Sequence, residues 1–152
     1  MTKIEELERV MATEVEMGEA LLQLLTRKQQ SIVGLQSDVL TSLLAQEETL
    51  LKPFRDLESE RTRLTAELVE SGTVPAGDET PNVPVEALLG YLTAGDAVRI
   101  STMAARLRTV VERILHMNNQ NRLHLQRSLR FVQDTLRLVT DDHTRQLVDH
   151  RV

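Results

Sequence analysis

Residues Asn118 to Val139 read NNQNRLHLQRSLRFVQDTLRLV, and they end the longest uninterrupted helical pattern in the chain. The first four residues are uncharged amides, which is an unusual choice for a solvated helix face. Five of the apolar residues after them recur at steps of four, three, four and three: Leu125, Leu129, Val132, Leu136 and Val139. Because an α-helix returns to the same face every three to four residues, this spacing predicts one apolar stripe along a helix.

The amino-acid composition predicts helices. Aliphatic residues and methionine supply nearly all of the apolar content, while aromatic residues make up 2% and tryptophan is absent. Slender helices that pack through aliphatic seams need few large rings, whereas a compact globule or a β-sandwich usually needs more. The length of 152 residues suits one hydrophobic core and not two. We therefore expect a single all-α domain over residues 1–152.

Charge and missing residue types exclude several functions. The net charge of −5 and the isoelectric point of about 5.4 argue against a nucleic-acid partner. The chain has no cysteine, so disulfides, cysteine-based zinc sites and thiol chemistry are excluded. No apolar run approaches the roughly eighteen residues of a membrane span, and the N-terminus is acidic where a signal peptide needs a basic start. We expect a soluble, cytoplasmic protein without membrane insertion.

A first long helix is predicted at the start of the chain. Thr2 and Glu5 form a capping-box pattern, so this helix should begin after Thr2 and end near Gln30. Its apolar stripe is interrupted by Glu14. The stripe also contains Gly18, which costs up to about 1 kcal/mol against alanine in a helix. We expect a neighbouring helix to approach closely at this glycine.

A short connection joins the first helix to the second. It covers residues 31–37, with Gly34 as the expected turn residue and Ser37 or Asp38 as the next N-cap. A link this short makes the second helix an antiparallel neighbour of the first. The second helical pattern continues in phase beyond Pro53, so this proline should kink the helix without ending it.

The second half of the chain combines a linker with a long helix. Residues 72–82, GTVPAGDETPN, contain two glycines and two prolines, which predicts a mobile linker after the second helix. A short helix at about 84–92 precedes a last helix from about 96 to 140. Asp96 or the glycine before it is the expected cap of this last helix, and a polar tail at about 140–152 follows.

These elements predict an elongated antiparallel three-helix bundle with coiled-coil-like packing. A short extra helix lies in the connection before the last long helix. The last helix is the longest, at roughly 65 Å, so we expect it to overhang its partners at one end.

The titratable residues form no recognisable catalytic or metal-binding pattern. A carboxylate-bridged metal site in a helical bundle needs Glu-x-x-His motifs on facing helices, whereas Glu112 and His116 are four residues apart and have no second copy. His124 lacks the lysine and the small residue that usually follow a phosphotransfer histidine. The glycines are scattered, so no phosphate-binding loop is present. We expect no enzymatic activity, no metal and no cofactor.

Two features of the opening stretch allow more than one interpretation. Amides in a helix seam can fix the register of two helices, or they can contact a partner directly. The upstream half of the last helix, Ile100 to Met117, is sufficient to pair with the first two helices. The stripe from Leu125 to Val139 is then either additional core or a groove for a helix of another protein.

Paired asparagines three apart are followed in this stretch by leucines, then by Ser-Leu and an aromatic residue. The residues concerned are Asn118, Asn121, Leu123, Leu125, Ser128, Leu129 and Phe131. This pattern resembles the signature of the FlgN family of flagellar export chaperones, and the predicted helices are similar to that family throughout the chain. One departure is the tail TDDHTRQLVDHRV, because many relatives have a short tail with a tyrosine and a glycine.

The resemblance implies a cytoplasmic chaperone of flagellar type III export. Such a chaperone binds the C-terminal segment of hook-associated (hook-filament junction) proteins, prevents their premature polymerisation and delivers them to the export gate. The partner-binding residues expected from the resemblance and the stripe are Asn118, Asn121, Leu125, Ser128, Leu129, Val132, Leu136 and Val139. The alternative is a self-associating helical scaffold or regulator without an export client. A homodimer in the absence of client is compatible with both functions.

Overall fold

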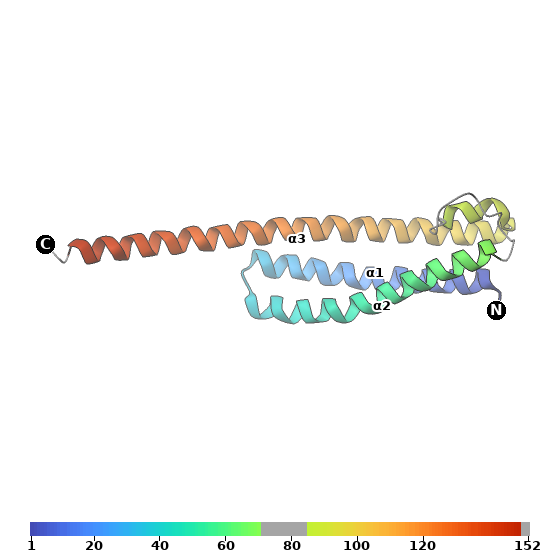
Figure 1. The fold of residues 1–152 in the computed structure, drawn as a ribbon, viewed down its shortest axis with the longest axis horizontal. Coiled ribbons are helices and arrows are strands. Elements are labelled where there is room, and N and C mark those ends of the chain that lie inside the picture. Colours follow the sequence, from blue (N-terminus) through green and yellow to red (C-terminus); the bar gives the residue numbers. More distant parts are fainter. Residues whose placement is uncertain (71–84, 150–152) are drawn as a thin grey trace.

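The computed structural model describes residues 1–70 and 85–149, and these residues form an all-α fold (Figure 1). Within them lie three long α-helices: α1 (Lys3–Val33), α2 (Ser37–Glu70) and α3 (Ala94–Asp149). A short 3₁₀ helix, η1 (Val85–Tyr91), precedes α3. The predicted fold class is confirmed, including the short extra helix before the last long one. The predicted linker at 72–82 lies outside the described residues.

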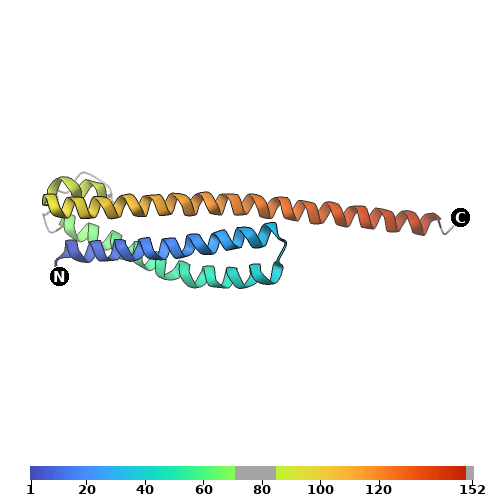
Figure 2. The same ribbon diagram turned by 180° about the vertical axis from the view of Figure 1, so that it is seen from behind.

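α1 is the helix against which the other two long helices pack. α2 runs antiparallel to α1, whereas α3 runs parallel to α1 and continues well beyond the α1–α2 turn (Figures 1 and 2). η1 packs on the first part of α3, at the end of the molecule that holds the N-terminus (Figure 1). The molecule is therefore a helical bundle at one end and a single helix at the other.

Hydrogen bonds at two helix starts set where those helices begin. The capping box predicted for α1 is confirmed: the Glu5 N–H donates to Thr2 Oγ1 at 3.2 Å, and the Thr2 N–H donates to Glu5 Oε2 at 2.8 Å. For α3 the expected cap, Gly95 or Asp96, is wrong. The helix begins one residue after Thr93, whose hydroxyl accepts from the Asp96 N–H at 3.3 Å. A threonine hydroxyl satisfies an N–H three residues later, and this moves the start upstream.

Gly34 lies in the α1–α2 turn, as predicted, but the left-handed residue of this turn is Leu35. Gly34 has a φ of −81° and is the C-cap of α1, whereas Leu35 has a φ of 53°. The Gln36 N–H donates to Ser31 O at 2.9 Å, and the Leu35 N–H donates to Ile32 O at 3.2 Å. These two bonds form a Schellman motif, which needs a left-handed residue directly after the C-cap. That position is held by a leucine and not by the neighbouring glycine.

α2 begins slightly earlier than expected and passes through its proline. Ser37 is the first helical residue, and the first turn closes on the Gln36 carbonyl at 2.9 Å, so the cap position belongs to Gln36 and not to Ser37 or Asp38. Pro53 lies inside the continuous helix, as predicted, and α2 bends part-way along its length (Figure 1).

α3 is longer than the sequence pattern indicated. We expected it to end near residue 140, but it continues to Asp149, which gives 56 residues and a length of about 84 Å. Residues 140–149 contain neither glycine nor proline. Polar composition alone does not terminate a helix, so without a breaker the backbone hydrogen bonding continues.

The hydrophobic core consists of two clusters along α1. The cluster near η1 contains Leu7, Val10, Met11, Leu64, Leu68, Val85, Leu88 and Ile100. The cluster nearer the α1–α2 turn contains Val15, Leu21, Leu22, Leu25, Leu107, Val110 and Ile114. A Cβ added to Gly18 would lie 2.6 Å from Val110 Cγ1 and 3.4 Å from Phe54 Cε2. The close approach predicted at Gly18 is confirmed, and side chains of both α2 and α3 make it.

Glu14, which interrupts the apolar stripe of α1, is 1% exposed. The Arg61 Nε of α2 donates a hydrogen bond to Glu14 Oε2 at 2.9 Å. Burial raises the pKa of the Glu14 carboxyl, and the charge and hydrogen bond of Arg61 offset this only in part. An ion pair between the buried Glu14 and the partly buried Arg61 therefore joins α1 to α2 between the two hydrophobic clusters.

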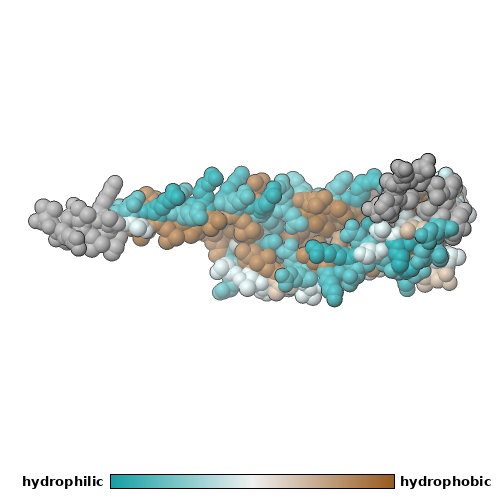
Figure 3. All heavy atoms as spheres, viewed as in Figure 1, coloured by the Kyte–Doolittle hydropathy of each residue, from teal (hydrophilic) through white to brown (hydrophobic). Residues whose placement is uncertain are grey.

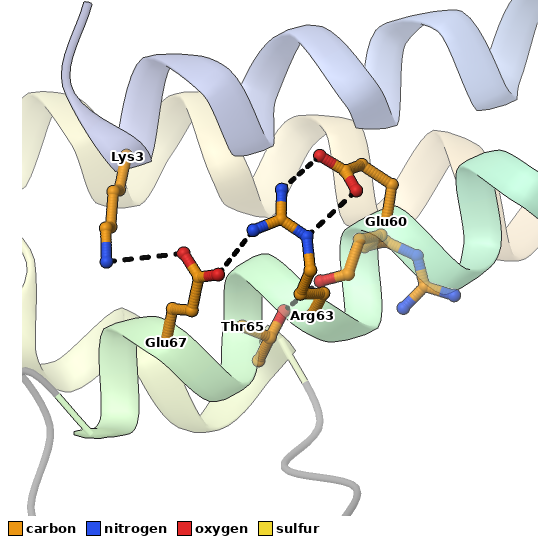
Figure 4. A network of polar contacts seen from close by, with 6 residues as sticks. Lys3, Glu60, Arg63, Thr65 and Glu67 are labelled. Atoms are coloured by element: carbon orange, nitrogen blue, oxygen red, sulfur yellow. Dashed lines mark hydrogen bonds and ion pairs between the residues drawn. The ribbon is translucent and has the colours of Figure 1, made fainter.

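A second polar network joins the same two helices at the surface (Figure 4). Arg63 binds both Glu60 and Glu67 within α2, and Glu67 also pairs with Lys3 of α1 at 3.3 Å. The hydrogen bonds from Arg63 hold the pKa of Glu60 below its ordinary value, and those from Lys3 and Arg63 do the same for Glu67. Because these side chains are partly exposed to solvent, their ion pairs contribute little to stability.

Replacing Gly18 with alanine should destabilise the fold, because the new methyl group meets the branched side chain of Val110. Overpacking of this kind costs about 2 kcal/mol, roughly twice the gain in helix propensity. Gly95→Ala is the matched control, since a Cβ at this helical glycine has open space, and it should be neutral or stabilising. Urea denaturation measures both. Equal changes in stability would contradict a close approach at Gly18.

Replacing Arg61 with methionine should destabilise the protein more at pH 8 than at pH 5. The folded-state pKa of Glu14 already lies above its ordinary value of 4.5, so the stability that this group contributes is lost as the pH rises above that value. Without Arg61 the pKa of Glu14 rises further, because the opposing charge is gone. At pH 8 the folded state then contains an unpaired buried carboxylate, which costs about 3 kcal/mol.

The control for this prediction is the same substitution in a Glu14→Gln background. Glutamine does not titrate, so Arg61→Met should there have the same effect on the free energy of unfolding at both pH values. Urea denaturation of the four proteins at pH 5 and pH 8 gives the comparison. A loss from Arg61→Met that is independent of pH in the presence of Glu14 would show that this carboxyl is not desolvated.

Candidate partner-binding site

One apolar face runs along α3 and changes its environment part-way. Its upstream members, including Ile100, Leu107 and Ile114, are buried against α1 and its neighbours. The downstream members are the stripe predicted from the sequence, and they are exposed, with Leu129 at 59% and Leu136 at 61%. The face loses its cover because α1 ends at Val33 while α3 continues. In the free protein the stripe is therefore surface and not core.

Asn121 marks the boundary between the two parts of this face. It is 2% exposed, and its Nδ2 donates to the backbone oxygen of Leu25 in α1 at 3.0 Å. The adjacent Gln120 accepts a bond from Gln29 of α1 at 3.3 Å. Asn118, one turn upstream, is exposed. The paired asparagines thus have different environments, and Asn121 lies in the α1–α3 interface, where it holds α3 against α1.

We call the part of α3 beyond Asn121, residues 122–149, the overhang. At its base lies a groove of about 280 Å³ between α3 and the α1–α2 turn. The residues that line it are Ser31, Ile32, Leu35, Gln36, Ser37, Leu40, Leu125, Ser128 and Val132. Figure 3 shows apolar surface along the overhang on the side that leads to the turn. The groove and the exposed stripe together form one continuous candidate site.

Five of the predicted site residues lie in the groove or on the exposed stripe next to it. Leu125, Ser128 and Val132 line the groove, while Leu129 and Leu136 lie on the exposed stripe. Val139 extends the stripe and is 62% exposed. Asn118 and Asn121 lie upstream of the groove, and neither lines it. Phe131 and Leu138, outside the stripe, are also exposed and widen the apolar surface of the overhang.

The sequence analysis missed the contribution of the α1–α2 turn to this site. Ile32, Leu35 and Leu40 line the groove, although the connection was expected only to reverse the chain. Leu35 combines 58% exposure with a left-handed conformation, which costs an L-residue about 1–2 kcal/mol. An exposed leucine in a turn, next to a glycine, was the available sequence signal. Backbone strain of this kind is often found where a binding surface is built.

A second groove offers less to a partner. It has a volume of about 370 Å³ and lies between α2 and α3, with Met11 and Glu14 of α1 in its lining. Its charged side chains are largely paired with each other, through Glu14 with Arg61 and Glu86 with Arg108. The exposed apolar stripe does not extend into it.

The described residues provide no sign of metal chemistry or membrane insertion. Across them, no group of three or more His, Cys, Asp or Glu side chains is arranged to hold a metal ion. Likewise, no helix in the described part of the chain is long and apolar enough to cross a bilayer.

A family model described as FlgN protein matches residues 1–148, which is almost the whole chain. The chain belongs to the FlgN family. No curated protein and no solved structure matches the chain closely enough to indicate a relationship. FlgN proteins are flagellar export chaperones and not enzymes, so the general role of this chain is to bind flagellar proteins as a chaperone.

The two asparagines of the FlgN signature should respond differently to the same substitution. Asn121→Asp removes the donor to Leu25 O and buries a carboxylate beside that carbonyl, at a cost of about 3 kcal/mol. Asn118→Asp changes an exposed residue and should stay within about 0.5 kcal/mol of the parent. Urea denaturation at pH 7 compares the two variants. Similar losses in both would place Asn121 outside the α1–α3 interface.

Proposed function

We propose that this FlgN protein is a cytoplasmic export chaperone for hook-associated (hook-filament junction) proteins. It binds their C-terminal segments, prevents premature polymerisation and delivers them to the gate of the flagellar type III export apparatus. Membership of the family supports the chaperone role. The observation that carries the choice of site is the apolar stripe of the overhang, which continues a core face and has no partner within the described chain.

The arrangement of α1 and α3 supports one mode of binding for a client helix. Upstream of Asn121, α1 covers the apolar face of α3 as a parallel neighbour. Downstream, a client segment that forms an amphipathic helix takes the same position relative to α3 that α1 holds upstream. The groove at the α1–α2 turn receives the end of that helix, with Ile32, Leu35 and Leu40 as its walls.

The expected energies are compatible with reversible binding. Ordering a disordered client segment costs about 2–5 kcal/mol or more. Each fully buried leucine or valine returns roughly 1.5–3 kcal/mol. The stripe offers Leu125, Leu129, Val132, Leu136 and Val139, all of which are at least 40% exposed in the free protein. Four or five such side chains suffice for binding, and the client still dissociates, as export requires.

Replacing both Leu129 and Leu136 with aspartate should abolish client binding without unfolding the protein. Both leucines are mostly exposed, so the change costs the free protein little. In the complex, two carboxylates face the apolar side of the client, and affinity should fall at least 100-fold. Titration of the full chain with a peptide from the C-terminus of a hook-associated protein measures binding, and circular dichroism melting measures stability.

The matched control for this prediction is the double variant Val98→Asp and Leu115→Asp. These residues are also exposed and on α3, but they lie upstream of the overhang. The control should bind the peptide as the parent does. Undiminished binding by the Leu129 and Leu136 variant, with an intact melting transition, would exclude the overhang as the client site. A collapsed melting transition would assign these leucines to the core.

A further inference from the structure

The part of the overhang that carries the stripe is basic, although the protein as a whole is acidic. The chain has a net charge of −5. Residues 122–140, however, contain four arginines and a single acid, Asp134, whereas residues 141–149 at the end of the overhang contain three aspartates and one arginine. The charge is therefore unevenly distributed, and the positive part coincides with the exposed apolar stripe.

The arginines beside the stripe have no acidic partner among the residues that the structure describes. Five of the nine bundle arginines form an ion pair with a Glu or Asp side chain, namely Arg61, Arg63, Arg99, Arg106 and Arg108. The other four form none with the residues that the structure describes. In the overhang, Arg127, Arg130 and Arg137 take part in no ion pair with any residue that the structure describes. Arg122 donates only to the neutral amide oxygen of Asn119, at 2.9 Å. The stripe-bearing part of the overhang therefore presents positive charge that no acid of the described residues pairs with.

Helix geometry places three of these arginines on one side of the stripe. At about 100° per residue, Arg122, Arg130 and Arg137 lie roughly 60–140° from the stripe centre, all in the same rotational direction. The opposite side of the stripe carries Thr135 and Phe131. The single acid, Asp134, lies on the far face of the helix. The apolar stripe thus has a basic border on one side, and successive arginines along this border are about two helical turns apart.

We infer that the overhang binds an amphipathic segment whose own apolar stripe is bordered by Asp or Glu residues facing this basic border. The inference rests on the proposed function and adds the chemistry of the client. Carboxylates on the client accept charge-assisted hydrogen bonds from Arg122, Arg130 and Arg137 once the stripes have met. They also fix which way round the client helix lies, and they raise the rate of encounter.

The same charges disfavour two other occupants. Two copies of the chain that paired through their overhangs would bring two basic segments together, and their repulsion opposes self-association through the stripe. An anionic membrane would attract the arginines, but the groove residues Leu125, Ser128 and Val132 lie against the projecting α1–α2 turn. A flat lipid surface does not fill such a concave site, whereas a helix does.

The experiment titrates the full chain with three designed amphipathic peptides of equal length. All three carry the same leucine and valine stripe, and the border positions are all Glu, all Gln or all Lys. We expect affinity in the order Glu, Gln, Lys, with about tenfold between successive peptides near 0.1 M salt. The differences should shrink as salt approaches about 1 M, because screening removes the charge contribution but spares the apolar one.

A charge-reversed variant, Arg130→Glu with Arg137→Glu, should invert the order so that the Lys peptide binds most tightly. The matched control is Arg55→Glu with Arg113→Glu, which changes the net charge of the protein equally at exposed positions outside the overhang. The control should keep the parental order. This separates local recognition from the overall charge of the protein.

Other results of these titrations would contradict either the acidic border of the client or the overhang as the client site. Equal affinity for the three peptides would leave the client site in place and refute the acidic border. No binding of any peptide would refute the overhang as a client site altogether. The protein could instead co-sediment with phosphatidylserine-containing vesicles and bind no peptide. If Arg130→Glu with Arg137→Glu abolished that co-sedimentation, the surface would be assigned to lipid. A dimer whose dissociation requires the Leu129 and Leu136 substitutions would assign it to a second copy of the chain.

Discussion

The fold depends on the burial of two apolar faces against a single helix, α1. α2 and α3 both pack on α1, and the hydrophobic clusters lie along it. Gly18 allows this, because any side chain there would collide with Val110 of α3 and meet Phe54 of α2. The buried Glu14 adds an ion pair with Arg61 on the side of α2. The length of α1 therefore decides how much of α3 is bundle and how much is a single helix.

The mismatch in length between α1 and α3 produces the candidate site. A helix of 31 residues runs beside one of 56, and the longer helix keeps its apolar periodicity beyond the end of the shorter one. Exposed leucines on the overhang forgo the burial energy that the same face gains upstream. The strained Leu35 adds a second cost at the same end of the bundle. Exposed leucines and a strained backbone residue at the same end of a fold are expected where a protein binds a partner.

Much of the architecture followed from the sequence because it depends on periodicity and on short-range chemistry. Helix spacing, the Thr2 capping box and the close approach at Gly18 all have local signals. The errors in the predicted helix caps arose where two or more adjacent residues could have accepted the same N–H hydrogen bond. Thr93, and not Asp96, caps α3, because its hydroxyl is correctly placed for a free N–H.

The candidate site was less predictable, because it combines segments that are distant in sequence. The stripe on α3 has a periodic signal, but periodicity does not say whether a neighbouring helix reaches far enough to cover it. That depended on α1 ending at Val33, and on the Schellman motif that turns Leu35 toward the groove region. The basic border was visible only as a local excess of arginine. Its position beside the stripe follows from the continuation of α3 as one helix.

The buried amide of Asn121 resolves a difficulty that such a repeating face creates. Apolar side chains at three-to-four spacing look alike from one turn to the next, so they alone distinguish poorly between α1–α3 registers that differ by about 5.4 Å. A slide of α1 by this distance would cover part of the stripe and close the groove. In the observed register Asn121 donates to Leu25 O and Gly18 lies against Val110, whereas a slide of one turn would bring a larger α1 side chain against Val110. The side-chain oxygen of Asn121 already lacks a partner among the described residues, so the amide is retained at a cost in stability. Asn121 and Gly18 together therefore hold α1 in the register that leaves the apolar stripe of the overhang uncovered.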